Sequence, residues 1–175
     1  MALSQIYGAD YPFEFLHSEL VSFLFNEEQN QSDGDKKSEF AGFDKPNAAT
    51  KLEAMGYRVG YSLVERIAKE FPRFSTELDC LKFMCKEFWS SVFRKQVDNL
   101  KTNHQGVYVV QDNKFWLLQP FSVGDQYKEL APRYLAFSCG LIRGALANLT
   151  ITTVVTASVE TLPAVKFNVH VQQKP

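Results

Sequence analysis

The stretch from Tyr134 to Val171 is nearly free of charge and changes its hydrophobic period once, which limits the folds that it can adopt. Residues 132–148 open with a proline and carry only two charged side chains, Arg133 and Arg143. A proline fits the first turn of a helix, and the apolar composition predicts that this helix is deeply buried. Residues 151–159 and 165–171 are separated by a proline-containing turn, and the second segment alternates apolar and polar side chains. The tail therefore predicts a buried helix followed by a β-hairpin.

The length and composition predict one domain that spans residues 1–175. With 175 residues, of which 45% are hydrophobic and 22% charged, the chain can bury one core but hardly two. The formal net charge of -1 gives no broad basic field for nucleic acid or for an anionic membrane. The sequence has no basic, apolar leader and no apolar run of membrane-spanning length. We therefore expect a cytoplasmic protein without direct membrane insertion.

The first expected helix, over residues 12–26, carries more apolar surface than a single core requires. The residues of its main stripe are Phe13, Leu16, Leu20, Phe23 and Leu24, and Phe15, Val21 and Phe25 widen this stripe. A helix that packs on one core needs only one such stripe, so the surplus indicates a second surface that another polypeptide covers. Residues 27–45 are rich in Gln, Asn, Ser and charge, and they predict a mobile loop.

Two further helices are expected before the first strands, and glycine pairs recur in two of the helices. Asn47 can cap a helix that continues until Pro72, and Thr76 can cap another that runs to about Phe93. The paired glycines are Gly56 with Gly60 and Gly140 with Gly144. A glycine inside a helix costs about 1 kcal/mol relative to alanine, so each pair favours the close approach of another backbone. This spacing alone is a weak signal outside membranes.

The middle of the chain predicts strands. Residues 106–111 and 114–118 are rich in β-branched and aromatic side chains, and the turn-forming pair Asp112-Asn113 separates them, which is typical of a hairpin. A further strand can precede them at residues 97–102. Helices, then strands, one helix and two more strands favour an α+β fold in which helices layer on one side of an antiparallel sheet.

The residues that could carry chemistry form no recognisable pattern. The three cysteines are Cys80, Cys85 and Cys139, and the three histidines are His17, His104 and His170. The cysteines have neither paired nor metal-ligand spacing, and the histidines are expected on different elements. A cysteine nucleophile, with Cys80 as its more exposed candidate, is kept only as an alternative. No phosphate-binding loop motif occurs, so we expect no catalytic residue, no metal and no cofactor.

Three long segments resemble the small core subunits of the TRAPP vesicle-tethering complex. They are LEAMGYRVGYSLVERI, FMCKEFWSSVFRKQVDNLKTNHQGVYVVQDNKFWLL and YLAFSCGLIRGALANL, the last followed by VTASV and PAVKFNV. The resemblance covers nearly everything outside residues 27–45. It implies a twisted antiparallel sheet under layered helices, with the two glycine pairs at close helix contacts.

The resemblance also implies a function. Small core subunits pair through their first two helices, here with a sister subunit that is usually subunit three, and the pairs join other TRAPP subunits. The assembled core promotes nucleotide exchange on a Rab-family GTPase in transport from the endoplasmic reticulum to the Golgi and within the Golgi. We expect this chain to be a scaffold at the surface of those membranes, with no catalytic residues of its own.

The resemblance and the surplus apolar surface predict the same partner interface. Its expected residues are Phe15, Leu16, Leu20, Phe23, Leu52, Met55 and Val59. An alternative is a module that holds an acyl chain between the helices and the sheet. The sister subunit carries an acylated cysteine after an arginine, and the matching positions here are Arg73 and Phe74. Because a phenylalanine cannot be acylated, this departure opposes the alternative.

Overall fold

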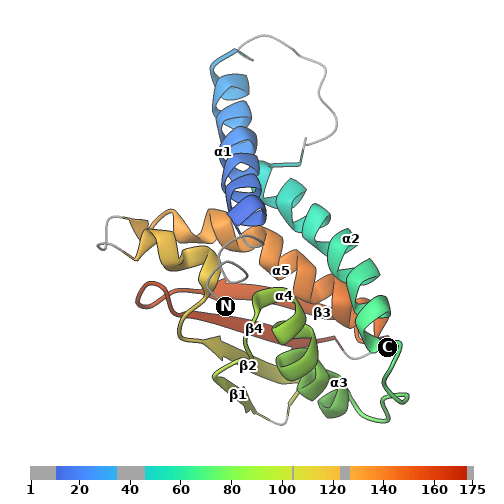
Figure 1. The fold of residues 1–175 in the computed structure, drawn as a ribbon. Coiled ribbons are helices and arrows are strands. Elements are labelled where there is room, and N and C mark those ends of the chain that lie inside the picture. The colour runs from blue at the N-terminus through green and yellow to red at the C-terminus, as the bar shows by residue number, and fades with distance from the viewer. Residues whose placement is uncertain (1–10, 35–45, 104, 123–126, 173–175) are drawn as a thin grey trace, which may run out of the picture.

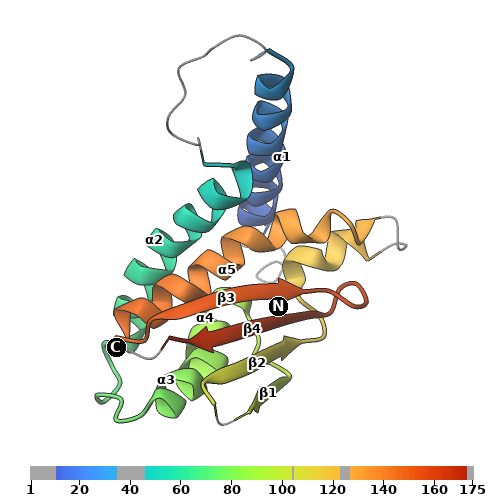
Figure 2. The same ribbon diagram turned by 180° about the vertical axis from the view of Figure 1, so that it is seen from behind.

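Four strands form one antiparallel sheet, and helices cover one of its faces (Figure 1, Figure 2). The computed structural model describes residues 11–34, 46–103, 105–122 and 127–172. The strands are β1 (Asn99–Thr102), β2 (Val107–Asp112), β3 (Thr153–Ser158) and β4 (Val165–Val171), in the spatial order β1-β2-β4-β3. Every neighbouring pair is antiparallel. This is the α+β architecture expected from the sequence, with the hairpin of the tail at the centre and one edge of the sheet.

The described helices occupy five stretches of the chain. They are α1 (Tyr11–Gly34), α2 (Ala48–Ala68), α3 (Glu77–Phe83), the π-helical η1 (Met84–Phe88), α4 (Trp89–Phe93), the 3-10 helix η2 (Trp116–Phe121) and α5 (Ala131–Asn148). Because α3, η1 and α4 follow one another without a break, they form the single helix predicted up to Phe93. The Thr76 side chain accepts a hydrogen bond from the Asp79 N–H at 3.1 Å and caps it, as expected.

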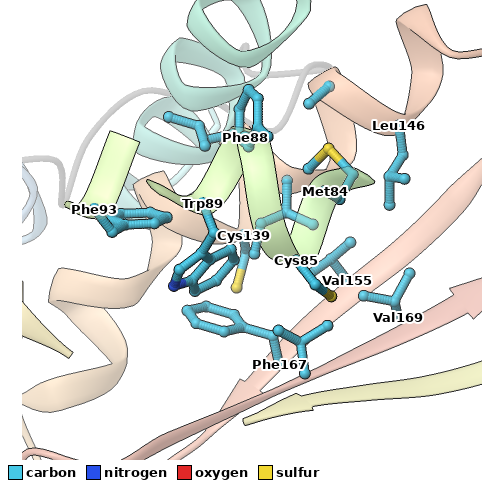
Figure 3. Close-up of a cluster of buried hydrophobic side chains, with 14 of the residues drawn as sticks. Met84, Cys85, Phe88, Trp89, Phe93, Cys139, Leu146, Val155, Phe167 and Val169 are labelled. Carbon is cyan, nitrogen blue, oxygen red and sulfur yellow. The ribbon is translucent and has the colours of Figure 1, made fainter. Parts of the chain in front are cut away.

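The core lies between this composite helix, α5 and the sheet. The side chains of Val165, Phe167 and Val169 on β4 alternate inward, and each is at most 1% exposed. Figure 3 shows Trp89 of α4 pointing at Phe167 from above the sheet, and the Phe93 ring lies beside Trp89 with 4.5 Å between the ring centroids. The ring centroids of Trp89 and Phe167 lie 5.5 Å apart in an edge-on arrangement, which aromatic pairs favour. The interior is filled by large rings.

A buried carboxylate joins the end of α4 to β2. Asp112 is 0% exposed and accepts hydrogen bonds from Trp89 Nε1 at 3.0 Å, from Lys95 Nζ at 2.7 Å and from the Lys114 N–H at 2.9 Å. A second carboxylate, Asp98, lies 2.8 Å from Lys95 Nζ, and this bond lowers the pKa of Asp98. The charge of Asp112 is therefore satisfied by three donors, as burial of a carboxylate requires.

The predicted hairpin of residues 106–111 and 114–118 is wrong in its second strand. β2 pairs instead with β1, which corresponds to the strand expected at residues 97–102, so the hairpin lies one segment earlier. After β2 the chain turns and enters the short helix η2, which contains Pro120. A proline has no N–H to donate to a sheet, and the apolar side chains before it pack into the core from this short helix instead.

The predicted end of the first helix near Asn26 is also wrong, because α1 continues to Gly34. The acidic side chains that follow Asn26 help to hold the next helix. Glu28 accepts a hydrogen bond from the Ala48 N–H at 3.4 Å, and Glu27 lies 3.3 Å from Lys51 Nζ. A carboxylate at a helix N-terminus is favourable, and Gly34 is the first strong helix breaker in this stretch. Residues 35–45 of the expected loop lie outside the described residues.

Candidate partner interface

The helices α2 and α5 lie in backbone contact, and the two glycine pairs face each other there. A methyl group at Gly56 would collide with the Phe137 carbonyl oxygen, and one at Gly60 with that of Leu141. The same holds for Gly140 against Glu53 and for Gly144 against Tyr57. Only glycine allows this approach, so the structure brings all four residues together at one helix crossing. The Arg143 guanidinium, 2.7 Å from the Glu53 carboxylate, closes one side of it.

The helix α1 contacts this pair through few side chains and then leaves the body of the molecule (Figure 1). Val21 and Leu24 of α1 are buried against Ala48 and Leu52 of α2 in a small cluster separate from the main core. The base of α1 reaches α5, where the ring of Phe13 lies 6.1 Å from that of Phe137. Most of the remaining surface of α1 is open to solvent.

The predicted interface residues divide by exposure. Phe15, Leu16 and Phe23 on α1 are 69%, 66% and 62% exposed, and Val59 on α2 is 44% exposed. A group of neighbouring large apolar side chains with this much exposed surface is unusual on a monomeric protein. Leu20 and Met55 are half-buried. The prediction for Leu52 is wrong, because this side chain is 0% exposed beneath α1 and cannot meet another polypeptide.

An apolar groove of about 720 Å³ opens between α1 and α2. One wall is formed by Phe13, Leu16 and Leu20 of α1, and the other by Met55, Val59 and Leu63 of α2. Phe137 of α5 lies at its floor. The groove is continuous with the exposed side chains of α1, since Leu16 belongs to both. Together they form one surface, which we call the α1–α2 face.

A buried histidine lies among the groove residues. His17 is 4% exposed and its ring lies 5.7 Å from that of Phe137, and among the residues that the structure describes its Nε2 atom has no hydrogen-bond partner. Burial lowers the pKa of His17 to about 4. The imidazole is therefore neutral at pH 7, and it acts as an aromatic packing group rather than as an acid or base in a reactive pair.

The thiols are not arranged for nucleophilic chemistry. Burial raises the pKa of Cys85 and of Cys139 to about 12, and burial next to Asp79 raises that of Cys80. The expectation that Cys80 is the more exposed cysteine is wrong, because it is 5% exposed, whereas Cys85 and Cys139 are 7% and 8% exposed. A thiol with a raised pKa holds almost no thiolate at neutral pH. Within the described residues, no group of three or more His, Cys, Asp and Glu side chains could hold a metal ion.

Known proteins are similar to this chain in sequence and in fold. Residues 13–172 match the family described as transport protein particle (TRAPP) component. The chain belongs to the TRAPP component family. It is 52% identical over 161 residues to trafficking protein particle complex subunit 6B of Homo sapiens, covering 92% of this chain and 96% of that protein. It is 51% identical over 157 residues to subunit 6A of Homo sapiens, covering 90% and 93%.

A solved structure in the TRAPP family has the same fold. It is described as trafficking protein particle complex subunit 3 from Naegleria fowleri covalently bound to palmitic acid. Its TM-score to this chain is 0.60 at 19% identity, covering 90% of this chain and 96% of that chain. In the part of the TRAPP chain that the structure describes, no helix is both long and apolar enough to cross a bilayer.

The position that the resemblance aligns with an acylated cysteine is occupied here by a packed ring. Phe74 follows Arg73 in the segment between α2 and α3, and its ring lies 4.9 Å from that of Phe83. Phe83 is buried and also contacts Phe71 at 5.0 Å. The aromatic side chains thus hold one another at this end of the core, and Phe74 offers no group that could form a thioester or an ester.

Several groove residues were missed from the sequence. Arg58, Ser62 and Arg66 line the groove on α2, yet no role was assigned to them from the sequence. They follow the same spacing of four as Met55, Val59 and Leu63 and lie on the adjacent row of the helix. A helical projection could have placed them beside the apolar row. Their position in a groove could not be known, because it requires α1 to lie opposite.

Proposed function

We propose that this chain is a non-catalytic scaffold subunit of the TRAPP vesicle-tethering complex, in the role of subunit six. It pairs through the α1–α2 face with a sister small subunit, subunit three. The observation that carries the proposal is an exposed apolar surface on α1 in a chain half identical to subunits 6A and 6B. Large apolar patches with adjacent grooves mark sites of stable protein association.

The proposal extends to the work of the assembled complex. The pair contributes to a core that promotes nucleotide exchange on a Rab-family GTPase in transport from the endoplasmic reticulum to the Golgi and within the Golgi. The chain then acts in the cytoplasm, at the surface of these membranes. The raised pKa values of its three thiols and the neutral His17 support a structural role, so we expect no exchange activity from the isolated chain.

We also propose that residues 1–175 act as a single domain, in which the expected loop does not begin at residue 27, because α1 continues to Gly34. Met55 and Tyr134 support this proposal, since each packs against both the main core and the cluster of Val21 and Leu24. Side chains shared by two clusters make them fold together.

Co-purification with tagged TRAPP subunit three tests the pairing. Leu16→Asp and Phe23→Asp each place a carboxylate at an exposed apolar position, and loss of a buried anchor costs about 2 kcal/mol or more of association. We expect each variant to release the partner. Val154→Asp is the matched control, because Val154 is also exposed, at 43%, but lies on β3. Unchanged recovery of both α1 variants would exclude this face as the interface.

The acyl-chain alternative has less support. The space between the helices and the sheet is filled by Trp89, Phe115 and Phe167, which are at most 1% exposed. The ring centroids of Trp89 and Phe115 each lie 5.5 Å from that of Phe167. The packed Phe74 side chain closes the aligned acylation position. Native mass spectrometry of the purified chain decides between the readings. An added mass that is lost on denaturation would favour a bound ligand over the scaffold.

A further inference from the structure

The two walls of the α1–α2 groove differ in charge. Arg58 and Arg66 of α2 line the groove and are exposed. Within the described residues, neither guanidinium has an ion pair, a hydrogen bond or an aromatic ring to stack on. The arginines of α5 behave differently, because Arg143 pairs with Glu53 at 2.7 Å and Arg133 lies over the Phe25 ring at 4.7 Å. The groove therefore holds two uncompensated cations.

These cations form a straight row beside the apolar row of α2. Arg58, Ser62 and Arg66 follow at intervals of four residues, which keeps them on one side of the helix. With a rise of about 1.5 Å per residue, the two guanidinium groups start about 12 Å apart along the axis. The apolar row of Met55, Val59 and Leu63 runs next to them along the groove. An occupant thus meets an apolar strip with positive charge along only one border.

Among the described residues that line the groove, no acidic side chain could pair with these arginines. All of its lining residues are apolar, aromatic or basic, apart from Ser62, and none carries a carboxylate. A second copy of this chain that docks groove to groove would bring four arginines together without a counter-charge from either lining. Like charges across an interface oppose association. The charge pattern therefore disfavours self-pairing through this groove and favours a different, acidic partner.

We propose that the groove selects an α-helix of a partner subunit whose apolar stripe is bordered on one side by carboxylates about two helical turns apart, which pair with Arg58 and Arg66. Arginine suits this role, since its planar guanidinium binds a carboxylate through two parallel hydrogen bonds. A helix offers side chains at spacings of three and four that match the apolar row of α2. The inference rests on the proposed pairing and adds the chemistry that selects the partner.

Association kinetics with TRAPP subunit three test this inference. The variant Arg58→Glu/Arg66→Glu reverses the charge of the row, and Lys69→Glu/Lys82→Glu is a matched control with the same change in net charge at exposed positions outside the groove. Rim charges act mainly on the rate of association. At about 50 mM salt we expect the groove variant to associate about tenfold more slowly, and at about 300 mM salt the difference shrinks because the Debye length falls. The control should stay within about twofold of the wild type.

The outcomes separate this inference from the proposed function. If subunit three does not bind the wild type, or if Leu16→Asp and Phe23→Asp bind normally, the pairing itself is wrong. If pairing holds but the groove variant and the control associate equally fast, or if salt does not change their difference, the charge selection is wrong. Self-association of the wild type in sedimentation that Leu16→Asp abolishes would assign the groove to a second copy instead. Should the double reversal fail to fold, Arg58→Gln/Arg66→Gln gives the same comparison at half the charge change.

Discussion

The helix α2 has two neighbours, and it meets them in opposite ways. Against α5 it presents Gly56 and Gly60, and the two backbones touch along the crossing. Against α1 it presents Leu52 at one end and an open groove along the rest. No other polypeptide can enter the contact between α2 and α5, since no side chain fits between these two helices. The contact between α2 and α1 leaves large apolar side chains exposed to water, so we expect another polypeptide to cover them. The same helix thus serves the fold on one side and assembly on the other.

The largest effect expected from this comparison is at the glycine crossing. A valine at Gly144 would place its Cβ against the Tyr57 carbonyl oxygen, and the helices would have to separate. Because overpacking against backbone cannot be relieved by a side-chain rotation, we expect a loss of about 3 kcal/mol or more in the free energy of unfolding. Chemical denaturation followed by circular dichroism measures this loss.

A matched control separates collision from helix propensity. Ala54→Val introduces the same side chain on an exposed position of α2. A β-branched residue in place of alanine costs about 0.5 kcal/mol in a helix. If Gly144→Val destabilised the protein no more than Ala54→Val does, the close backbone contact between α2 and α5 would be disproved.

Much of the secondary structure around the core could be predicted from local sequence signals, and the exceptions have physical reasons. The alternation from Val165 to Val171 marks β4 because one of its faces is buried and the other is wet. Residues 114–118 have the composition of a strand, but Pro120 and the core contacts of their side chains override that propensity. The π-helical turn at Met84–Phe88 has no sequence signal, because it depends on how the helix packs on the core.

The α1–α2 face could be predicted only in part. The surplus of phenylalanine on α1 indicated an unpaired surface, since no single core needs so many rings. Leu52 was assigned to that surface because helical spacing places it in line with Met55 and Val59, whereas α1 covers it. The role of Arg58 and Arg66 was missed for the same reason. Which part of a stripe is covered depends on the crossing of two helices, and a single helix pattern does not contain that information.

The second effect is a loss of stability in acid. It should arise from His17 on α1 rather than from the core between α5 and the sheet. The folded protein keeps His17 neutral, with a pKa of about 4, whereas the unfolded chain binds a proton below pH 6.5. Stability is therefore greatest above pH 6.5 and falls as the pH drops toward 4. Over that window the loss approaches about 3 kcal/mol, at about 1.4 kcal/mol per pH unit. Urea denaturation at about pH 7, 6 and 5 measures how steeply the free energy of unfolding changes with pH.

His17→Leu provides the control for the acid effect. The leucine keeps an apolar side chain beside Phe13 and Phe137 but removes the titrating group, so the slope between pH 7 and pH 5 should become shallower. It also removes the unpartnered Nε2 atom. Equal slopes in the wild type and His17→Leu would show that His17 does not report on the burial of α1.

The smallest effect on the free energy of unfolding is expected at the exposed apolar side chains of α1. Phe23 is 62% exposed, so Phe23→Asp removes little buried area and adds a carboxylate that water can solvate. We expect the free energy of unfolding of the isolated chain to change by no more than about 0.5 kcal/mol, the usual range for surface substitutions. The same variant should abolish recovery of subunit three, although its fold is intact. A residue that matters for association and not for stability is the signature of a surface meant for a partner. If Phe23→Asp instead lowered stability by as much as Gly144→Val, α1 would belong to the folded body, and the contrast between the two sides of α2 would disappear.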